Sequence, residues 1–180
     1  MSSLKFHTIQ SVLTSAALYP IIGDKAIPFG IAAVLIDLDH VAEYVRDTKC
    51  LDVRGLFTYS KLTELNLDKN FLVLSGFHTL ECFALVAILA WFSPVCAYVL
   101  AGMAYHVITD IIHLVRLGHP FARAYSIIEY VYRSKKSHAI ITMHELLKKQ
   151  EITTAGVRDF EMWKQRWQNA RSGLRKEHHL

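Results

Sequence analysis

Histidine and carboxylate side chains recur at helical spacing in an apolar segment near residue 110. At about 100° per residue, His106, Asp110 and His113 fall within about 60° of arc on one face of a helix. Two imidazoles and a carboxylate on one face suit a divalent ion such as zinc, manganese or iron. A buried hydrogen-bonded His–Asp pair is the alternative, but a stripe of three such residues favours the metal.

A second group of such residues ends another apolar segment. Asp37, Asp39 and His40 follow 11 uncharged residues, 26–36. If the chain is helical there, Asp37 and His40 share a face and Asp39 is free to pair with Glu43. If the segment is extended or is a distorted helix end, Asp37 and Asp39 face the same way. A solvated acidic turn at a helix end is a further alternative, and the residue types do not decide among the three.

A third pair, His78 and Glu81, is spaced as neighbours on a helix surface. Glu81 carries the single formal charge between residues 70 and 109. Charged groups inside apolar helices are costly, so Glu81 needs a role: metal ligand, partner that orients His78, or general base. His7, near the start of the first apolar segment, offers one more imidazole.

These groups together exceed what one tetrahedral ion needs and predict a site for one to three ions, zinc first and manganese or iron next. Such sites hydrolyse phosphoesters or amides through metal-activated water, and Glu81 and Asp39 are the expected proton carriers. The predicted metal ligands are His7, Asp37, Asp39, His40, His78, Glu81, His106, Asp110 and His113. No Gly-rich phosphate loop, G-x-S-x-G or H-E-x-x-H motif occurs, which disfavours nucleotide kinases, serine hydrolases and zincin proteases.

Four apolar helices are expected to position these side chains. Ser93-Pro94 interrupts the longest apolar stretch, and this pair is typical of a helix start, so the stretch divides into a hairpin. The last two helices are the stronger candidates to span a membrane, and a soluble bundle is the alternative. The expected helices cover about residues 4–19, 27–45, 70–92 and 94–117, joined by a polar connector over about 46–69.

Composition and charge support a membrane-associated all-α bundle. The chain has 180 residues, 52% of them hydrophobic and 20% charged, which excludes a disordered chain. Up to Ile112 there are 7 Lys/Arg and 10 Asp/Glu, whereas from His113 onward there are 13 and 6. The sequence thus predicts an apolar bundle over 1–118 and a basic amphipathic tail over 119–180, with helices near 121–134, 137–149 and 157–172. The tail is expected in the cytoplasm. Its last helix either lies at the surface of the lipid bilayer or packs on the chain's own bundle, because both produce the same apolar stripe.

The order of these motifs resembles the YdjM-type predicted membrane-bound metal-dependent hydrolases. In this chain, Asp37, Asp39 and His40 match the family's D-x-D-H, His78-Thr79 matches its second histidine motif, and His106 with Asp110 matches its H-x-x-x-D. The H-x-x-x-D spacing is also distantly similar to zinc-dependent phospholipase C. The resemblance covers about residues 4–118 and implies a bacterial inner-membrane protein that uses a divalent metal to hydrolyse its substrate.

The expected function is metal-dependent hydrolysis of a lipid or a membrane-proximal small-molecule phosphoester. One alternative is a non-catalytic membrane protein with a structural metal site, or with a site that transports metal ions or protons. Another is binding of DNA or a protein partner through the basic tail, although nucleic acid is not the expected partner.

Overall fold

The structure, a computed structural model of the chain, describes residues 4–65, 71–136 and 141–142. Its contacts group the chain into two compact units, one of residues 1–39 and 75–120, the other of residues 40–74 and 121–180. Helices predominate, which confirms the predicted all-α class in its coarse form. The second unit also contains a small sheet, which the sequence does not predict.

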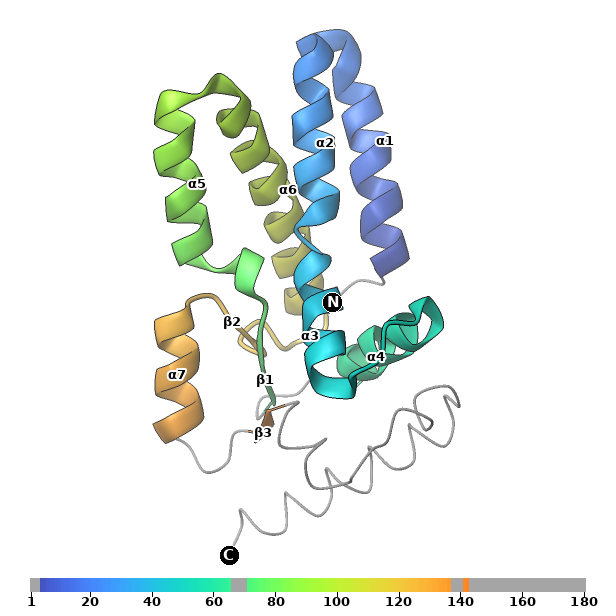
Figure 1. The fold of residues 1–180 in the computed structure, drawn as a ribbon, viewed down its shortest axis with the longest axis vertical. Helices are drawn as coiled ribbons and strands as arrows, with labels where there is room; N and C mark the ends of the chain where they lie inside the picture. The colour runs from blue at the N-terminus through green and yellow to red at the C-terminus, as the bar shows by residue number, and fades with distance from the viewer. Residues whose placement is uncertain (1–3, 66–70, 137–140, 143–180) are drawn as a thin grey trace, which may run out of the picture. The chain divides into compact units, whose positions relative to one another are not determined.

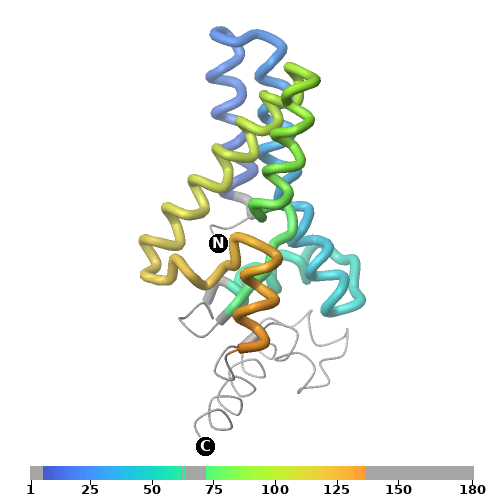
Figure 2. The backbone as a smooth tube through the Cα atoms, turned by 90° about the vertical axis from the view of Figure 1, so that its left-hand side faces the viewer, coloured from blue at the N-terminus to red at the C-terminus, as the bar shows by residue number. Residues whose placement is uncertain are grey.

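The first unit is built from two helical hairpins. Helix α2 packs against both α1 and α6, and α5 packs against α6. Figures 1 and 2 show the turns of the α1–α2 and α5–α6 hairpins at the same end of this unit. Its elements are α1 (Leu4–Ile22), η1 (Gly23–Lys25), α2 (Ala26–Leu35), η2 (Gly76–His78), α5 (Leu80–Phe92) and α6 (Pro94–Arg116).

Local sequence signals explain where these helices begin and end. Gly23 adopts a left-handed backbone conformation, φ 61°, directly after α1, and glycine reaches this region at little cost. The Thr79 side chain accepts a hydrogen bond from Cys82 N–H and caps the start of α5. Pro94 occupies the first turn of α6 directly after Ser93, which confirms the predicted hairpin break.

The α2 and α6 backbones approach each other closely around Gly102. A Cβ atom at position 102 would overlap the carbonyl oxygen of Phe29, so only glycine fits there without a shift of one helix. Beside this crossing, Ala32, Ile36 and Met103 form the buried apolar core. Close contact between small residues is typical of helix pairs in membranes, although it also occurs in soluble bundles.

The helix predicted over 27–45 is interrupted. Helix α2 ends at Leu35, and α3 (Leu38–Thr48) begins after a turn at Ile36 and Asp37. The Asp37 N–H bonds to the Val34 carbonyl in a tightened last turn, and this bond ends the regular ladder of α2. The distorted-end alternative is therefore the correct one of those left open by the sequence.

The helix predicted over 70–92 is wrong in its first half. Residues Phe71–Leu74 form strand β1, η2 follows, and α5 is only 13 residues long. A short apolar run such as Phe-Leu-Val-Leu does not distinguish a strand from a buried helix by its pattern alone. Within the described part of the chain, only α6 is long and apolar enough to cross a membrane.

The second unit contains a three-stranded parallel sheet with β1 at its centre. Val73 pairs with Arg123 and Leu72 pairs with Thr142, and helix α7 packs on β1 and β2. Helix α4 lies within the segment predicted as a polar connector. Besides most of α3, this unit contains α4 (Val53–Leu65), β1, β2 (Arg123–Ala124), α7 (Ile127–Lys136) and β3 (Ile141–Thr142).

Two tyrosines join α3 to α4 in this unit. The rings of Tyr44 and Tyr59 lie 5.6 Å apart, and Tyr59 Oη donates to Asp47 Oδ2 at 2.7 Å. Burial, with the Asp47 carboxylate as a further cause, raises the pKa of Tyr59 well above its usual value. The Tyr59 hydroxyl therefore stays a donor at physiological pH.

Part of the predicted tail lies outside the described residues. The helix predicted near 121–134 is correct only from Ile127 onward, where α7 lies, because Arg123–Ala124 form β2. The helix predicted near 157–172, and that near 137–149 apart from β3, fall outside the described residues. The division predicted at residue 118 stays a prediction.

Candidate metal centre

Five buried histidine and aspartate side chains meet in the first unit. They come from the start of α1, the turn after α2, the end of η2 and the second half of α6. Their positions along the helices place them at the opposite end of the hairpins from the turns (Figure 1). The five are His7, Asp37, His78, His106 and Asp110, with exposed fractions from 0% to 7%.

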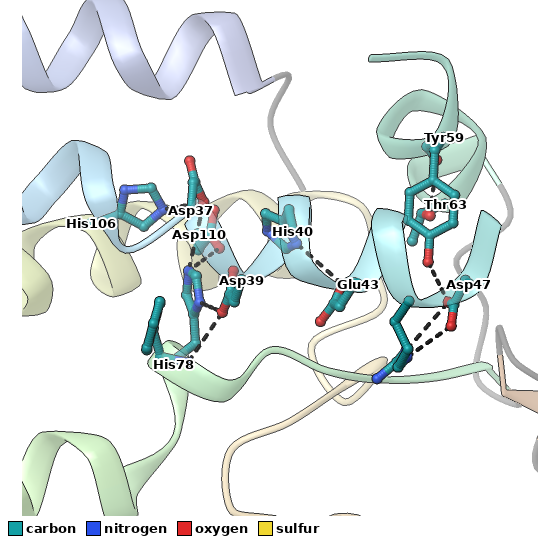
Figure 3. A network of polar contacts seen from close by, with 12 residues as sticks. Asp37, Asp39, His40, Glu43, Asp47, Tyr59, Thr63, His78, His106 and Asp110 are labelled. Atoms are coloured by element: carbon teal, nitrogen blue, oxygen red, sulfur yellow. Dashed lines mark hydrogen bonds and ion pairs between the residues drawn. The ribbon is translucent and has the colours of Figure 1, made fainter. Parts of the chain in front are cut away.

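The Nε2 atoms of the three histidines face the two carboxylates. His7 Nε2 lies 2.8 Å from Asp110 Oδ1, and His106 Nε2 lies 3.2 Å from Asp37 Oδ1. His78 Nε2 lies 3.6 Å from Asp110 Oδ2 and 3.9 Å from Asp37 Oδ1. Figure 3 shows His78 reaching toward the carboxylates. Polar groups from four separate segments thus converge, as the sequence predicts.

A backbone carbonyl fixes the ring of His106. Its Nδ1 lies 2.7 Å from the Ala33 carbonyl oxygen, which also accepts a hydrogen bond from Ser11 Oγ at 3.3 Å. The Ala33 carbonyl is in the last turn of α2, where carbonyls are released from the helix ladder. Because a carbonyl only accepts, His106 Nδ1 carries the proton, and in the neutral ring Nε2 presents its lone pair to Asp37.

A carboxylate fixes the ring of His78 in the same way. Its Nδ1 lies 2.8 Å from Asp39 Oδ2, which also accepts from the Phe77 N–H at 3.2 Å. An ionised carboxylate only accepts, so the His78 proton lies on Nδ1 and the lone pair lies on Nε2. Metal-binding histidines commonly have this second contact, which sets the tautomer and the ring orientation. Asp39, predicted as a ligand and proton carrier, is thus positioned to orient His78.

This arrangement fits a divalent cation. Lone pairs of neutral His78 and His106 directed at carboxylate oxygens repel unless a cation or a proton lies between them. Two buried aspartates near one histidine also require a compensating charge. Donor atoms about 2.0–2.1 Å from a tetrahedral zinc lie about 3.3 Å apart, and the four N–O distances in this cluster, from 2.8 to 3.9 Å, bracket that value.

The two oxygens of Asp110 face different histidines, His7 and His78. His7, His106 and Asp110 offer donor atoms within 4.8 Å of one another and form one candidate ligand group. Asp37 and His78 belong to another. A carboxylate with one oxygen toward each group can bridge two cations, as in two-metal hydrolytic sites.

Apart from Asp39, the predicted ligands outside these five are His40, Glu81 and His113. His40 belongs to the second unit, where its Nδ1 lies 3.3 Å from Glu43 Oε2. Glu43, which the helical alternative offered as a partner for Asp39, thus contacts His40. Glu81 and His113 are half-buried, and neither joins a candidate ligand group among residues 4–65, 71–136 and 141–142.

One set of supporting contacts escaped the sequence-based reasoning. Tyr105 Oη bonds to Thr14 Oγ1 at 2.7 Å and to Gln10 Nε2 at 3.0 Å, which ties α1 to α6 beside His7. The signal is a stripe of polar residues at i, i+3, i+4 and i+7 in an otherwise apolar helix. Its members are His7, Gln10, Ser11 and Thr14.

Comparison of the chain with protein-family models, curated proteins and solved structures gives no match.

Proposed function

We propose that this protein is a membrane-associated metal-dependent hydrolase that cleaves a phosphoester of a lipid or of a molecule held at the membrane. The observation that carries the proposal is the convergence of three histidine Nε2 atoms on Asp37 and Asp110, with the opposite nitrogens of His78 and His106 already bonded. The resemblance to the YdjM-type hydrolases supports the same function, and with it a place in a bacterial inner membrane.

The roles of the side chains follow from these contacts. His7, His78 and His106 bind the cation through Nε2, and Asp37 and Asp110 supply two negative charges that balance a divalent ion. Asp39 holds His78 in its tautomer. A bound divalent cation lowers the pKa of water and neutralises charge on phosphoryl oxygens. Glu81, in the first turn of α5, remains the proposed proton carrier.

The outer surface of the first unit supports association with a membrane. Its buried cluster is polar, whereas its helices expose large apolar side chains, the reverse of a soluble bundle. Helix α6 is long enough to span a bilayer. The exposed apolar residues on α1, α2, α5 and α6 include Phe6, Ile9, Val12, Leu13, Ile27, Ile31, Leu85, Ile88, Trp91, Phe92, Val95, Ile108 and Ile112.

An apolar groove beside the cluster supports a lipid substrate. It has a volume of about 440 Å³ and is lined entirely by apolar side chains of α2, η2, α5 and α6. Ile36 and Phe77 line the groove and directly precede Asp37 and His78. An acyl chain in the groove would therefore lie next to a phosphoester at the cluster.

A closed structural metal site is the second candidate function, because the five side chains are at most 7% exposed. Structural zinc sites are closed, whereas catalytic sites keep a position open for water or substrate. A structural site predicts that loss of metal lowers stability and that no turnover accompanies metal binding.

Turnover in lipid nanodiscs tests the proposal. The full chain, loaded with zinc or manganese, should release phosphorylated head group from phosphatidylglycerol. His106→Ala and Asp110→Asn should each lower the rate more than about 100-fold. This loss is larger than the one expected when a residue that only orients a metal ligand is replaced. Asp24→Asn, at an exposed carboxylate in the hairpin turn, is the matched control and should keep the rate.

Bis(4-nitrophenyl) phosphate serves as a substrate without an acyl chain. Cleavage of this compound but not of the lipid would contradict the proposed lipid substrate but not the proposed hydrolase activity. A metal-loaded, folded chain that cleaves neither would contradict the hydrolase proposal and favour the structural site.

A further inference from the structure

We propose that helix α7 is a docking surface for an anionic lipid surface. At about 100° per residue, six residues of α7 fall within about 180° of arc, which is half of the helix surface. Four are large and apolar, exposed by 42% to 76%, and the other two are exposed lysines. The apolar four are Ile127, Ile128, Val131 and Tyr132, and the lysines are Lys135 and Lys136.

The charge of this exposed half is entirely positive. Glu129, the one acid of α7, is half-buried just past the edge of this half, where its Oε1 accepts from Arg133 Nη1 at 2.8 Å and its Oε2 accepts from Tyr125 N–H at 2.9 Å. Arg133 also donates to the Phe121 carbonyl. Two lysines therefore remain beside the apolar side chains without a neighbouring acid on that half, which is complementary to lipid phosphates.

Packing within the second unit holds helix α7 in place. Its other side packs on strands β1 and β2 of the second unit. Lys136 Nζ lies 4.9 Å from the centre of the Tyr132 ring, so its stem runs along the apolar surface with the charge at the end. A fixed helix loses little conformational entropy when its exposed half enters a lipid head-group region.

A bilayer is the occupant that the chain connectivity favours over a free protein partner. Ten residues separate the end of α6 from the start of α7, a span of at most about 35–40 Å. Helix α6 is the one candidate membrane span among the described residues. If α6 lies in a bilayer, α7 stays within reach of its surface. The charge and exposure of α7 do not depend on the metal site.

A fluorescent label on α7 tests the inference. Bimane is attached to Ile128→Cys in the full chain, after Cys50, Cys82 and Cys96 are replaced by serine, and the protein is placed in nanodiscs. The emission should shift to the blue and be quenched by brominated lipid in discs that contain phosphatidylglycerol. The shift should be weaker in pure phosphatidylcholine and should fall as salt rises. Lys61→Cys, exposed on α4 of the same unit, is the control label and should not shift.

A second variant identifies the occupant. Lys135→Glu with Lys136→Glu should lower the ratio of docked to undocked helix at least about 30-fold in anionic discs, since each lysine near such a surface contributes about fivefold. A label that stays in water overturns the inference. A shift that is equal in both lipids and insensitive to the lysines also overturns it, because the contact would then not depend on the charge of the lipid. Neither the label experiment nor the lysine variant measures hydrolase activity.

Discussion

The Nδ1 atom of His78 lies 2.8 Å from Oδ2 of Asp39, and 39 positions separate the two residues in the chain. This contact places the proton of His78 on Nδ1 and leaves Nε2 to face Asp37 and Asp110. Asp39 therefore acts on the cluster through His78. Its own Oδ2 is already occupied by His78 and by the Phe77 N–H.

Substitution of Asp39 should weaken metal binding in steps. Asp39→Asn keeps an acceptor for His78 but loses the charge, and we expect about tenfold weaker zinc binding. Asp39→Ala loses both, and we expect a loss of about 100-fold. Competition with a fluorescent zinc chelator measures both affinities, with Asp24→Asn as the control. Unchanged affinity in Asp39→Ala would show that Asp39 does not position His78.

Substitution of Gly102 should destabilise the α2–α6 pair. In Gly102→Ala the new methyl group overlaps the Phe29 carbonyl oxygen, and we expect a cost of about 1–3 kcal/mol in the free energy of unfolding. Gly76→Ala is the matched control, because no atom lies within 4 Å of a Cβ there. Thermal unfolding in detergent compares the two variants, and equal midpoints would contradict the close approach of α2 and α6.

The hydroxyl of Tyr105 should hold α1 against α6. Tyr105→Phe removes the bonds to Thr14 and Gln10, and we expect a loss of about 1–3 kcal/mol in unfolding free energy. Zinc affinity should also fall, because α1 carries His7. Tyr98→Phe, on the same helix, should change neither quantity. A Tyr105→Phe protein with unchanged stability and affinity would show that these bonds do not position His7.

The buried Tyr59 predicts a pH dependence of stability. Its pKa is raised in the folded chain, chiefly by burial, so its contribution is fully present below the unfolded value of 10.0 and is lost as pH rises above it. Stability of the unsubstituted protein should therefore fall more steeply above pH 10 than that of Tyr59→Phe. Urea unfolding between pH 8 and 11 measures this, and parallel curves for the two proteins would contradict the raised pKa.

The sequence predicts the ligand-bearing helix α6 well because its signal is local. His106 and Asp110 are one turn apart in an apolar segment, and a regular helix then requires that they share a face. His113 is on the same stripe, yet it is half-buried and outside the candidate groups. Helical spacing alone does not say how far along a helix the neighbouring segments extend.

Other features depend on contacts between distant segments. The interruption of α2 at Asp37 decides which aspartates face His78, and the sequence left this open. Strand β1 forms because Val73 and Leu72 pair with residues at least 50 positions away, a partnership that an apolar run of four residues does not reveal. The role of the Ala33 carbonyl is likewise invisible in residue types, because every residue has one.

The metal content of the purified full chain tests whether the five buried side chains of the first unit bind a divalent ion. The untagged protein, loaded with zinc in detergent and dialysed, is analysed for metal per chain by plasma mass spectrometry. Because three histidine nitrogens and two carboxylates converge, we predict at least one tightly held divalent ion per chain. The doubly substituted Asp37→Asn, Asp110→Asn protein should hold none. A folded, unsubstituted chain without metal, or a doubly substituted chain that keeps its ion, would show that these side chains are not a divalent metal site.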